Sequence, residues 1–236
     1  MTRKKFFLIF CFLIIDIILI VGFLVIRDAT SFNELKKEVY SLSKLDLTKD
    51  RYNRRIKSNG EYAIVERTIK EYLDGCAVDV QYLSSMMNDS TLSNILSYDN
   101  YQKDGPEFTK SIEYLEKSKK EYNEKIDSLL SNMDEEYIYS LINKKINDPY
   151  YISLYRELIL DDNIMDDINE VKGVLEDTRK KMNVIYDSSI EVLKYLKENK
   201  DNWKLEDNEI KFQTQGMYDH YMSIINKVKP SEEKSL

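Results

Sequence analysis

The sequence predicts an all-α protein: an N-terminal transmembrane helix followed by an extracytoplasmic helical bundle with one small β-hairpin near its C-terminus. Three observations support this. A continuous apolar segment covers Phe6–Ile26, apolar positions recur every three or four residues over most of the remainder, and apolar side chains alternate around residues 203–212. About 200 residues follow the apolar segment, enough for one domain with a core over 28–229. Gly at 6 and Pro at 3 are too few for a disordered chain.

The apolar segment has the length and composition of a membrane span. All residues of Phe6–Ile26 except Cys11, Asp16 and Gly22 are Leu, Ile, Val or Phe, and such a helix is about 31 Å long. The apolar residues favour insertion by about 5 to 11 kcal/mol, which outweighs roughly 3 kcal/mol for the charge. Residues 25–28 offer no small-residue cleavage site, so we expect an uncleaved signal anchor.

Charge predicts the orientation of the span. Residues 1–5 contain Arg3, Lys4 and Lys5, which predicts a cytoplasmic tail there and an extracytoplasmic location for the residues after the span. The first 27 residues carry a net charge of +3 within a total of −7, so the outer domain carries −10. An acidic domain without a basic stripe repels phosphate backbones, so we expect no nucleic-acid partner.

Asp16 occupies the middle of the predicted span, where an ionisable group is costly and is a candidate for function. We expect it to contact a polar residue in the span of a partner protein. The alternative is that a protonated carboxyl is simply tolerated in a very apolar helix.

A capping pattern and the spacing of apolar residues predict the first helices after the span. Ser31 and Glu34 have the spacing of a capping box, which predicts a helix from Ser31 to about Leu45. Residues 46–60 lack an apolar period and end in a turn, so we expect a connector there. A three-and-four spacing then predicts a long helix over Glu61–Met87.

The middle of the chain alternates between short and long elements. We expect a short helix over Ser90–Leu96, a loop over Tyr98–Pro106, and a helix that begins at Pro106 and reaches Leu129. Asp134 then begins a helix through Ile146, and Asp148-Pro149 begins another through Leu160.

The longest predicted helix follows, and its apolar positions alternate by four and three from Ile164 to Leu196. This stripe includes Thr178 and Ser189, which weakens the alternative of an intermolecular coiled coil and favours packing within a bundle. Alternating residues then predict a hairpin over residues 203–212, with its turn at Asp207-Asn208. We expect a closing helix over residues 215–228 and a free tail over residues 230–236.

The sequence contains no pattern typical of a catalytic, cofactor or metal site. His220 is the only histidine, and an exposed location is the simpler interpretation of it. Cys11 and Cys76 lie in different media, so no disulfide framework is expected. The acidic run over residues 161–167 lacks the glycine and the glutamate of a calcium loop, and acids in the first turn of a helix complement its dipole.

The 18 tyrosines include a group around the two short helices after residue 134. Surface tyrosines favour protein interfaces, although many tyrosines of this chain fall on inward-facing stripes. We therefore expect a contact surface formed by Tyr137, Tyr139, Tyr150, Tyr151 and Tyr155.

Three stretches, Leu45–Asn53, Tyr62–Glu66 and Lys103–Phe108, resemble uncharacterised membrane-anchored proteins of low-GC Gram-positive bacteria. The resemblance covers most of the chain and brings no activity or site residues. It implies a single-pass protein of the bacterial cell membrane.

The sequence favours a non-enzymatic, membrane-tethered interaction or scaffold module of the cell envelope. Its partner is expected to be another protein or a second copy of the chain. The alternative is a subunit that binds a small ligand and couples to a partner membrane protein through its span. A pocket between the helices would favour that alternative, and convergent carboxylates in a cleft would favour an envelope hydrolase.

Overall fold

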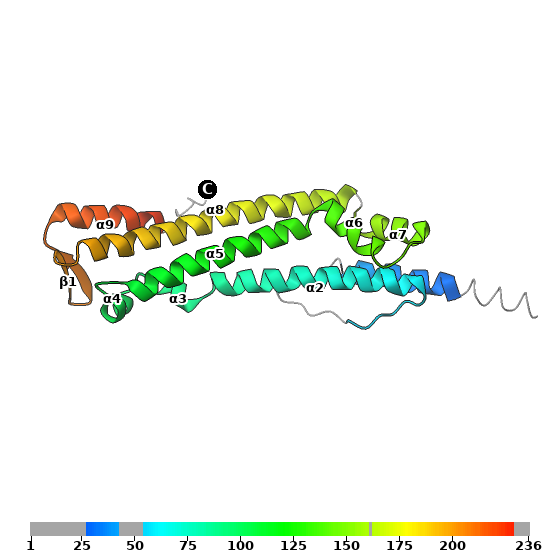
Figure 1. Cartoon of the computed structure of the whole chain (residues 1–236), viewed down its shortest axis with the longest axis horizontal. Coiled ribbons are helices and arrows are strands. Elements are labelled where there is room, and N and C mark those ends of the chain that lie inside the picture. Colours follow the sequence, from blue (N-terminus) through cyan, green and yellow to red (C-terminus); the bar gives the residue numbers. More distant parts are fainter. Residues whose placement is uncertain (1–26, 43–53, 161, 229–236) are drawn as a thin grey trace, which may run out of the picture. The chain divides into compact units, whose positions relative to one another are not determined.

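The computed structural model describes residues 27–42, 54–160 and 162–228 of the chain. These residues are mostly helical, as predicted, and form two compact units (Figure 1). Unit 1 comprises the described residues up to Ala77 together with Asp134–Met165, and unit 2 comprises the others. The predicted span and the predicted free tail lie outside the described residues. Among the helices that are described, none has the length and apolar character needed to traverse a bilayer.

Unit 1 contains the helix over residues 27–42, the first part of α2 (Glu61–Met87), α6 (Glu135–Asn143) and α7 (Pro149–Ile159). The last two begin at aspartate caps, as predicted. Asp134 accepts hydrogen bonds from the amides of residues 136 and 137, and Asp148 accepts one from the next residue but one. The apolar core of this unit includes Leu35, Val65, Ile69, Ile138, Ile142, Leu154 and Tyr155.

Residues 27–30, before the predicted helix start at Ser31, are already helical. Ser31 lies inside the helix over residues 27–42 and is buried, so the prediction of a capping box at Ser31 and Glu34 is wrong. That pattern marks a helix start only where the preceding chain leaves the helix, and residues 27–30 contain no Gly or Pro that would end it. Residues 54–60 are not helical, which agrees with the predicted connector.

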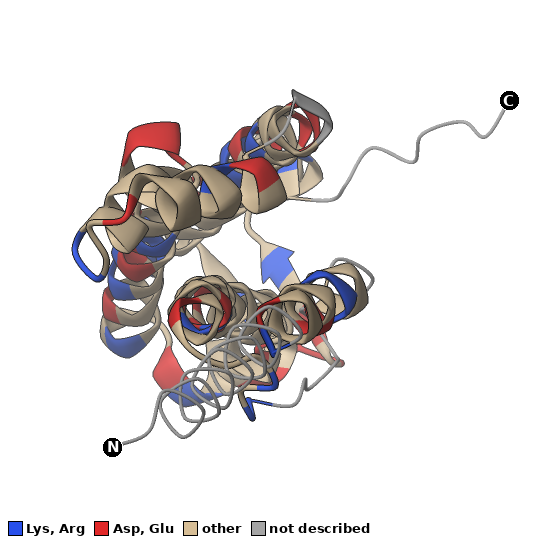
Figure 2. Ribbon diagram, turned by 90° about the vertical axis from the view of Figure 1, so that its right-hand side faces the viewer, with Lys and Arg blue, Asp and Glu red and all other residues tan. Residues whose placement is uncertain are grey.

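Unit 2 contains the rest of α2, α3 (Ser90–Ser93), α4 (Tyr98–Asp104), α5 (Thr109–Asn132), nearly all of α8 (Asp162–Glu198), the hairpin and α9 (Gln215–Val228). Helices α5 and α8 run antiparallel. Their register is marked by contacts between polar groups: Arg179–Asp127 at 2.5 Å, Asn123–Asn183 at 2.8 Å and Lys119–Asp187 at 2.6 Å. Acidic and basic residues are interspersed along the helices (Figure 2), so opposite charges can pair across neighbouring helices.

The predicted hairpin is confirmed. Strand β1 (Trp203–Glu206) pairs antiparallel with β2 (Glu209–Phe212), and both turn residues have positive φ, at 54° and 61°, as a type I′ turn requires. The Trp203 ring stacks on Phe108 with centroids 6.0 Å apart, and its Nε1 donates to the Leu196 carbonyl at 2.7 Å. The aromatic face of the hairpin therefore packs on the helices of unit 2.

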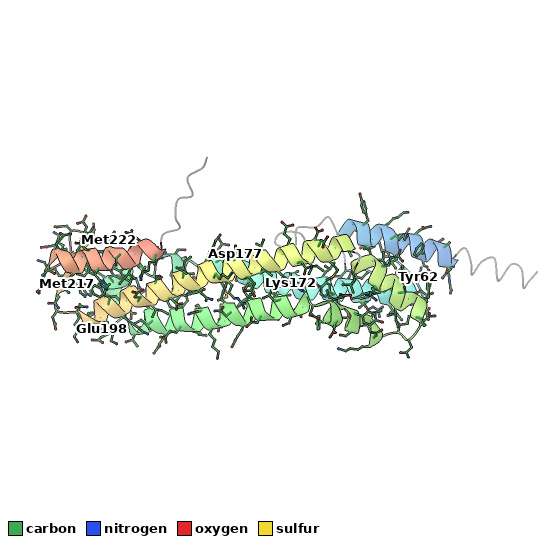
Figure 3. The ribbon with its side chains drawn as sticks, turned by 90° about the horizontal axis from the view of Figure 1, so that it is seen from above. Tyr62, Lys172, Asp177, Glu198, Met217 and Met222 are labelled. Carbon is green, nitrogen blue, oxygen red and sulfur yellow. The ribbon has the colours of Figure 1, made fainter. Side chains whose placement is uncertain are left out.

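Helix α9 closes unit 2 by running back along the end of α8. The Tyr195 hydroxyl donates to the Met217 carbonyl at 3.1 Å, and Lys227 pairs with Glu191 at 3.0 Å. Figure 3 shows this antiparallel arrangement, with Met217 at the start of α9.

Two predictions in the middle of the chain are wrong. The expected loop over Tyr98–Pro106 contains helix α4, and α5 begins at Thr109 instead of Pro106. Only Tyr101 of α4 is buried, so the helix carries no apolar period, and the Ser97 side chain caps it by accepting from the amide of residue 100. Phe108 precedes α5 at φ 51° and is fully buried.

The predicted stripe of α8 is buried only in its second half. Met182, Ser189 and Leu196 are buried, whereas no described side chain from residue 164 to residue 181 is. Helix α5 contacts Arg179 through Asp127 and ends soon afterwards at Asn132, so α8 extends beyond this neighbour. The first half of the stripe thus lies outside the core of unit 2.

Gly105 cannot carry a side chain without local rearrangement. A Cβ at this position would lie 2.4 Å from the Tyr101 carbonyl oxygen and 3.0 Å from the Phe108 ring. We predict that Gly105→Ala lowers the free energy of unfolding by about 1–3 kcal/mol through this overpacking. Thermal or urea unfolding measures the change.

Gly173 provides the matched control, because a Cβ there would meet nothing within 4 Å and the residue lies inside α8. Gly173→Ala should raise the stability by about 0.5–1 kcal/mol. Equal effects of the two substitutions would contradict the close approach at Gly105.

Candidate functional site

The described residues contain no set of His, Cys, Asp and Glu that could hold a metal ion. His220 is exposed and lies against the Tyr195 ring, with centroids 4.8 Å apart. Cys76 is buried in unit 1. Neither residue therefore marks a reactive centre by its geometry. The other features that could form a site are buried charges, exposed faces and grooves.

A buried charge network lies at the centre of unit 1. The Lys70 ammonium donates to Glu38 at 2.7 Å, to Glu66 at 2.8 Å and to the Arg55 carbonyl at 2.9 Å. Lys57 pairs with the other carboxylate oxygen of Glu38. Because an ammonium has three donors, Lys70 is fully hydrogen-bonded.

Glu66 is completely buried and is held by backbone as well as by side chains. Its carboxylate accepts from the Ser58 amide at 2.8 Å, from the Ser58 hydroxyl at 2.7 Å and from the Lys57 amide at 3.0 Å. Burial alone would raise the pKa of this carboxyl, but the hydrogen bonds from Lys70 and Ser58 outweigh it and hold the pKa below its ordinary value.

The network joins three segments: the helix over residues 27–42, the connector near residue 57 and α2. For Glu38, too, burial would raise the carboxyl pKa, and the hydrogen bonds from Lys57 and Lys70 lower it overall. Each carboxylate is paired with a lysine, and Lys70 and Glu66 are buried with their hydrogen-bonding groups engaged inside the network. It is a structural element, which the sequence signalled only by Glu66 and Lys70 standing four residues apart beside the apolar stripe.

An aromatic cluster lies at the other end of the helix over residues 27–42. The Tyr62 hydroxyl donates to Asp28 at 3.2 Å and lies 3.3 Å from the Tyr150 hydroxyl. The Tyr151 ring meets Tyr62 edge-on at 4.9 Å, and the Phe32 ring lies 5.9 Å from it. Figure 3 shows Tyr62 where α2, the helix over residues 27–42 and α7 meet. Burial, and then the bond to Tyr150, raise the pKa of the Tyr62 hydroxyl.

The tyrosines of the predicted contact surface have different environments. Tyr137, Tyr139 and Tyr150 are exposed, and Tyr151 is half-buried within the aromatic cluster. Tyr155 is fully buried and its hydroxyl donates to the Ile138 carbonyl at 3.2 Å, so it belongs to the core of unit 1 and not to a surface. Asp16, the other predicted contact residue, lies outside the described residues.

An uncovered apolar face lies on the first half of α8. Val171 and Val174 are 44% and 59% exposed, and Thr178, half-buried, follows one turn later. The same face is buried further along the helix, at Met182 and Ser189. The predicted stripe included Val171, Thr178, Met182 and Ser189 but not Val174, and the sequence did not indicate where neighbouring helices would stop covering it.

A groove of about 250 Å³ lies in unit 2. Apolar and methionine side chains form most of its wall, which is lined by Met87, Leu92, Ser93, Ile95, Leu96, Met182, Ile185, Ser189 and Val228. Ser189 is almost fully buried, and its hydroxyl is the one buried side-chain polar atom of the described residues without a hydrogen-bond partner. The Ser93 hydroxyl, in contrast, donates to the Asp89 carbonyl at 3.1 Å.

Comparison with known proteins adds no family to this geometry. No family model, curated protein or solved structure matches the chain.

Removing one carboxylate of the charge network should destabilise the protein strongly. Glu66→Gln leaves Lys70 with one carboxylate partner and alters the contacts to Ser58, so we predict a loss of about 3–5 kcal/mol in unfolding free energy. The native pKa values of Glu38 and Glu66 lie below the unfolded value of about 4.3. Their contribution to stability is therefore present above that pH and is lost as the pH falls through the native pKa.

Urea unfolding of the wild type and of Glu66→Gln from pH 7 to pH 3 measures both effects, and the variant should show a flatter dependence. Glu71→Gln is the control, because Glu71 is 57% exposed and pairs with Lys145 at the surface. Glu71→Gln should lower the free energy of unfolding by less than about 1 kcal/mol. A similar cost for both variants would show that the network does not stabilise the fold.

Proposed function

We propose that the chain is a non-enzymatic interaction or scaffold module of the bacterial cell envelope, tethered by Phe6–Ile26 with its helical part outside the cytoplasmic membrane. The observation that carries the proposal is the attachment of residue 28 to the folded unit. Asp28, two residues after the predicted span, already accepts a hydrogen bond from Tyr62 of α2. The folded unit thus includes a residue that lies only two positions after the predicted anchor.

The aromatic cluster supports a location at the membrane surface. Two hydrogen bonds of 3.2 and 3.3 Å lead from Asp28 through Tyr62 to Tyr150, which is 53% exposed. The polar layer of a bilayer is about 5–7 Å thick on each side, so this tyrosine belongs near that layer. Tyrosine is enriched there because its ring is apolar and its hydroxyl is polar. An exposed apolar face on α8 supports contact with another protein.

Labelling of the full chain in intact cells tests the location. In a Cys11→Ala background, Tyr40→Cys places a thiol at a position that is 64% exposed in unit 1. A membrane-impermeant maleimide should label it without lysis. Labelling only after lysis would contradict an extracytoplasmic domain.

Cross-linking in membranes tests the interaction. A pull-down of the full chain should recover a partner protein or a second copy, and Asp16→Leu should reduce recovery if that carboxyl contacts a partner span. Repeated recovery of the chain alone, as a monomer, would refute the interaction function. Unchanged recovery with Asp16→Leu would remove the role of Asp16 only.

The groove of unit 2 favours a second candidate, a subunit that binds a small ligand and couples to a partner through its span. An apolar cavity of about 150 Å³ holds benzene, so 250 Å³ suits roughly ten non-hydrogen atoms. No charged residue is among those that line the groove, and Ser189 supplies one unpaired hydroxyl. The fitting ligand is therefore neutral and apolar, with one hydrogen-bonding group.

Two matched probes, 4-ethylphenol and ethylbenzene, test this candidate. Both should shift the NMR signals of the Met87 and Met182 methyl groups. Ser189→Ala should weaken binding of the phenol about three- to tenfold, the value of one net hydrogen bond, and should leave ethylbenzene unchanged. Ser93→Ala should change neither affinity, because that hydroxyl is already paired. Unshifted methyl signals with both probes would exclude the ligand site.

A further inference from the structure

We propose that the first half of α8 binds a second copy of the same chain in an antiparallel pairing, with a two-fold axis beside Val174. This inference rests on the proposed interaction function and names the partner. The surface, here called the α8 face, consists of Asp167, Glu170, Val171, Val174, Thr178 and Lys181. All six belong to unit 2, so the surface lies within one compact part of the molecule.

The centre of the α8 face is apolar and open. Val171 and Val174 are 44% and 59% exposed and lie one turn apart, with Thr178 on the next turn. The Thr178 hydroxyl donates to the Val174 carbonyl at 2.8 Å, so burying it leaves no unmet donor.

The ends of the α8 face carry opposite charges. Asp167 and Lys181 are separated by close to four helical turns, so they lie on nearly the same side, and Val174 stands midway between them. Both are exposed, and neither forms an ion pair with another residue in the described parts of the chain. Glu170 adds a second acid at the Asp167 end.

This charge order selects one mode of self-association. In an antiparallel pair about Val174, Asp167 faces Lys181 of the partner subunit, and the same contact repeats on the other side of the axis. A parallel pair would place Asp167 beside Asp167 of the partner subunit, and lysine beside lysine, which is repulsive. The α8 face is therefore complementary to itself only in the antiparallel direction.

The size of the surface explains why tethering matters. A contact limited to about four turns of one helix is smaller than the roughly 1,000 Å² expected of a stable interface between free proteins. Two chains held in one membrane have a much higher effective concentration, so a weak contact can be populated there. The pairing should accordingly be detectable in membranes and be lost on dilution in detergent.

Cross-linking at the axis tests the proposal in full-length chain within membranes. In a Cys11→Ala background, Val174→Cys brings two thiols together at the axis, and a short bis-maleimide should give a covalent dimer. Val184→Cys is the matched control, because Val184 is 49% exposed on the same helix, but its two copies would lie about 30 Å apart in this pairing. The control should give at least tenfold less dimer.

Charge exchange gives a second, independent readout. In the Val174→Cys chain, Lys181→Glu should reduce the dimer yield several-fold, and adding Asp167→Lys should restore it. Equal dimer yields at positions 174 and 184, or a yield that Lys181→Glu leaves unchanged, would overturn the α8 face. A chain that captures another membrane protein but gives no dimer at position 174 would overturn the inference and leave the proposed function standing. A chain that captures neither would refute both.

Discussion

The position of the Lys70 ammonium between Glu38 and Glu66 is the constraint on which unit 1 depends. Two lysines balance two carboxylates, and the amides of residues 57 and 58 complete the shell around Glu66. A charge without its partner in this place would cost several kcal/mol, so alternative packings of the three segments are strongly disfavoured. Apolar burial gives unit 1 most of its stability, while the network specifies which segments meet and in which register.

Unit 2 uses polar contacts in a related way, but at the edges of its helices. The amides of Asn123 and Asn183 exchange hydrogen bonds, and Arg179 contacts both Glu176 and Asp127. A slide of α5 along α8 by one turn would leave the apolar faces in contact and would break these pairs. The aromatic stack of Trp203 on Phe108 then fixes the hairpin at the end of the same helices.

The sequence predicted the elements whose signals are local. The period of α2 gave its bounds, the aspartate caps gave the starts of α6 and α7, and the change to alternation gave the hairpin. Helix α4 was missed because Tyr101 is its one buried residue. A single apolar position cannot show the three-and-four spacing that predicts a helix. The charge network was missed because it forms only when Glu38, a residue far away in the sequence, packs against Lys70 beside Glu66.

The candidate sites show the same difference between local signals, which the sequence contains, and tertiary packing, which it does not. The stripe of α8 and its serine were visible in the sequence, but their environments depend on where α5 ends and how α3 and α9 pack. The contact surface of tyrosines was predicted from clustering in sequence, and the structure removes Tyr155 from it because that ring fills the core. Clustering along a chain says little about which side of a short helix each ring occupies.

The order of charge along α8, acidic at residue 167 and basic at residue 181, has a geometric consequence for an anchored protein. Two chains that share a membrane and the same topology must be related by a two-fold axis along the membrane normal, because a two-fold axis in the membrane plane would invert one anchor and place its N-terminus on the opposite side. Helices that become antiparallel under such an axis lie perpendicular to it. Two anchored chains that pair through α8 therefore lay this helix flat along the membrane surface, whereas an upright α8 could pair in this way only between facing membranes.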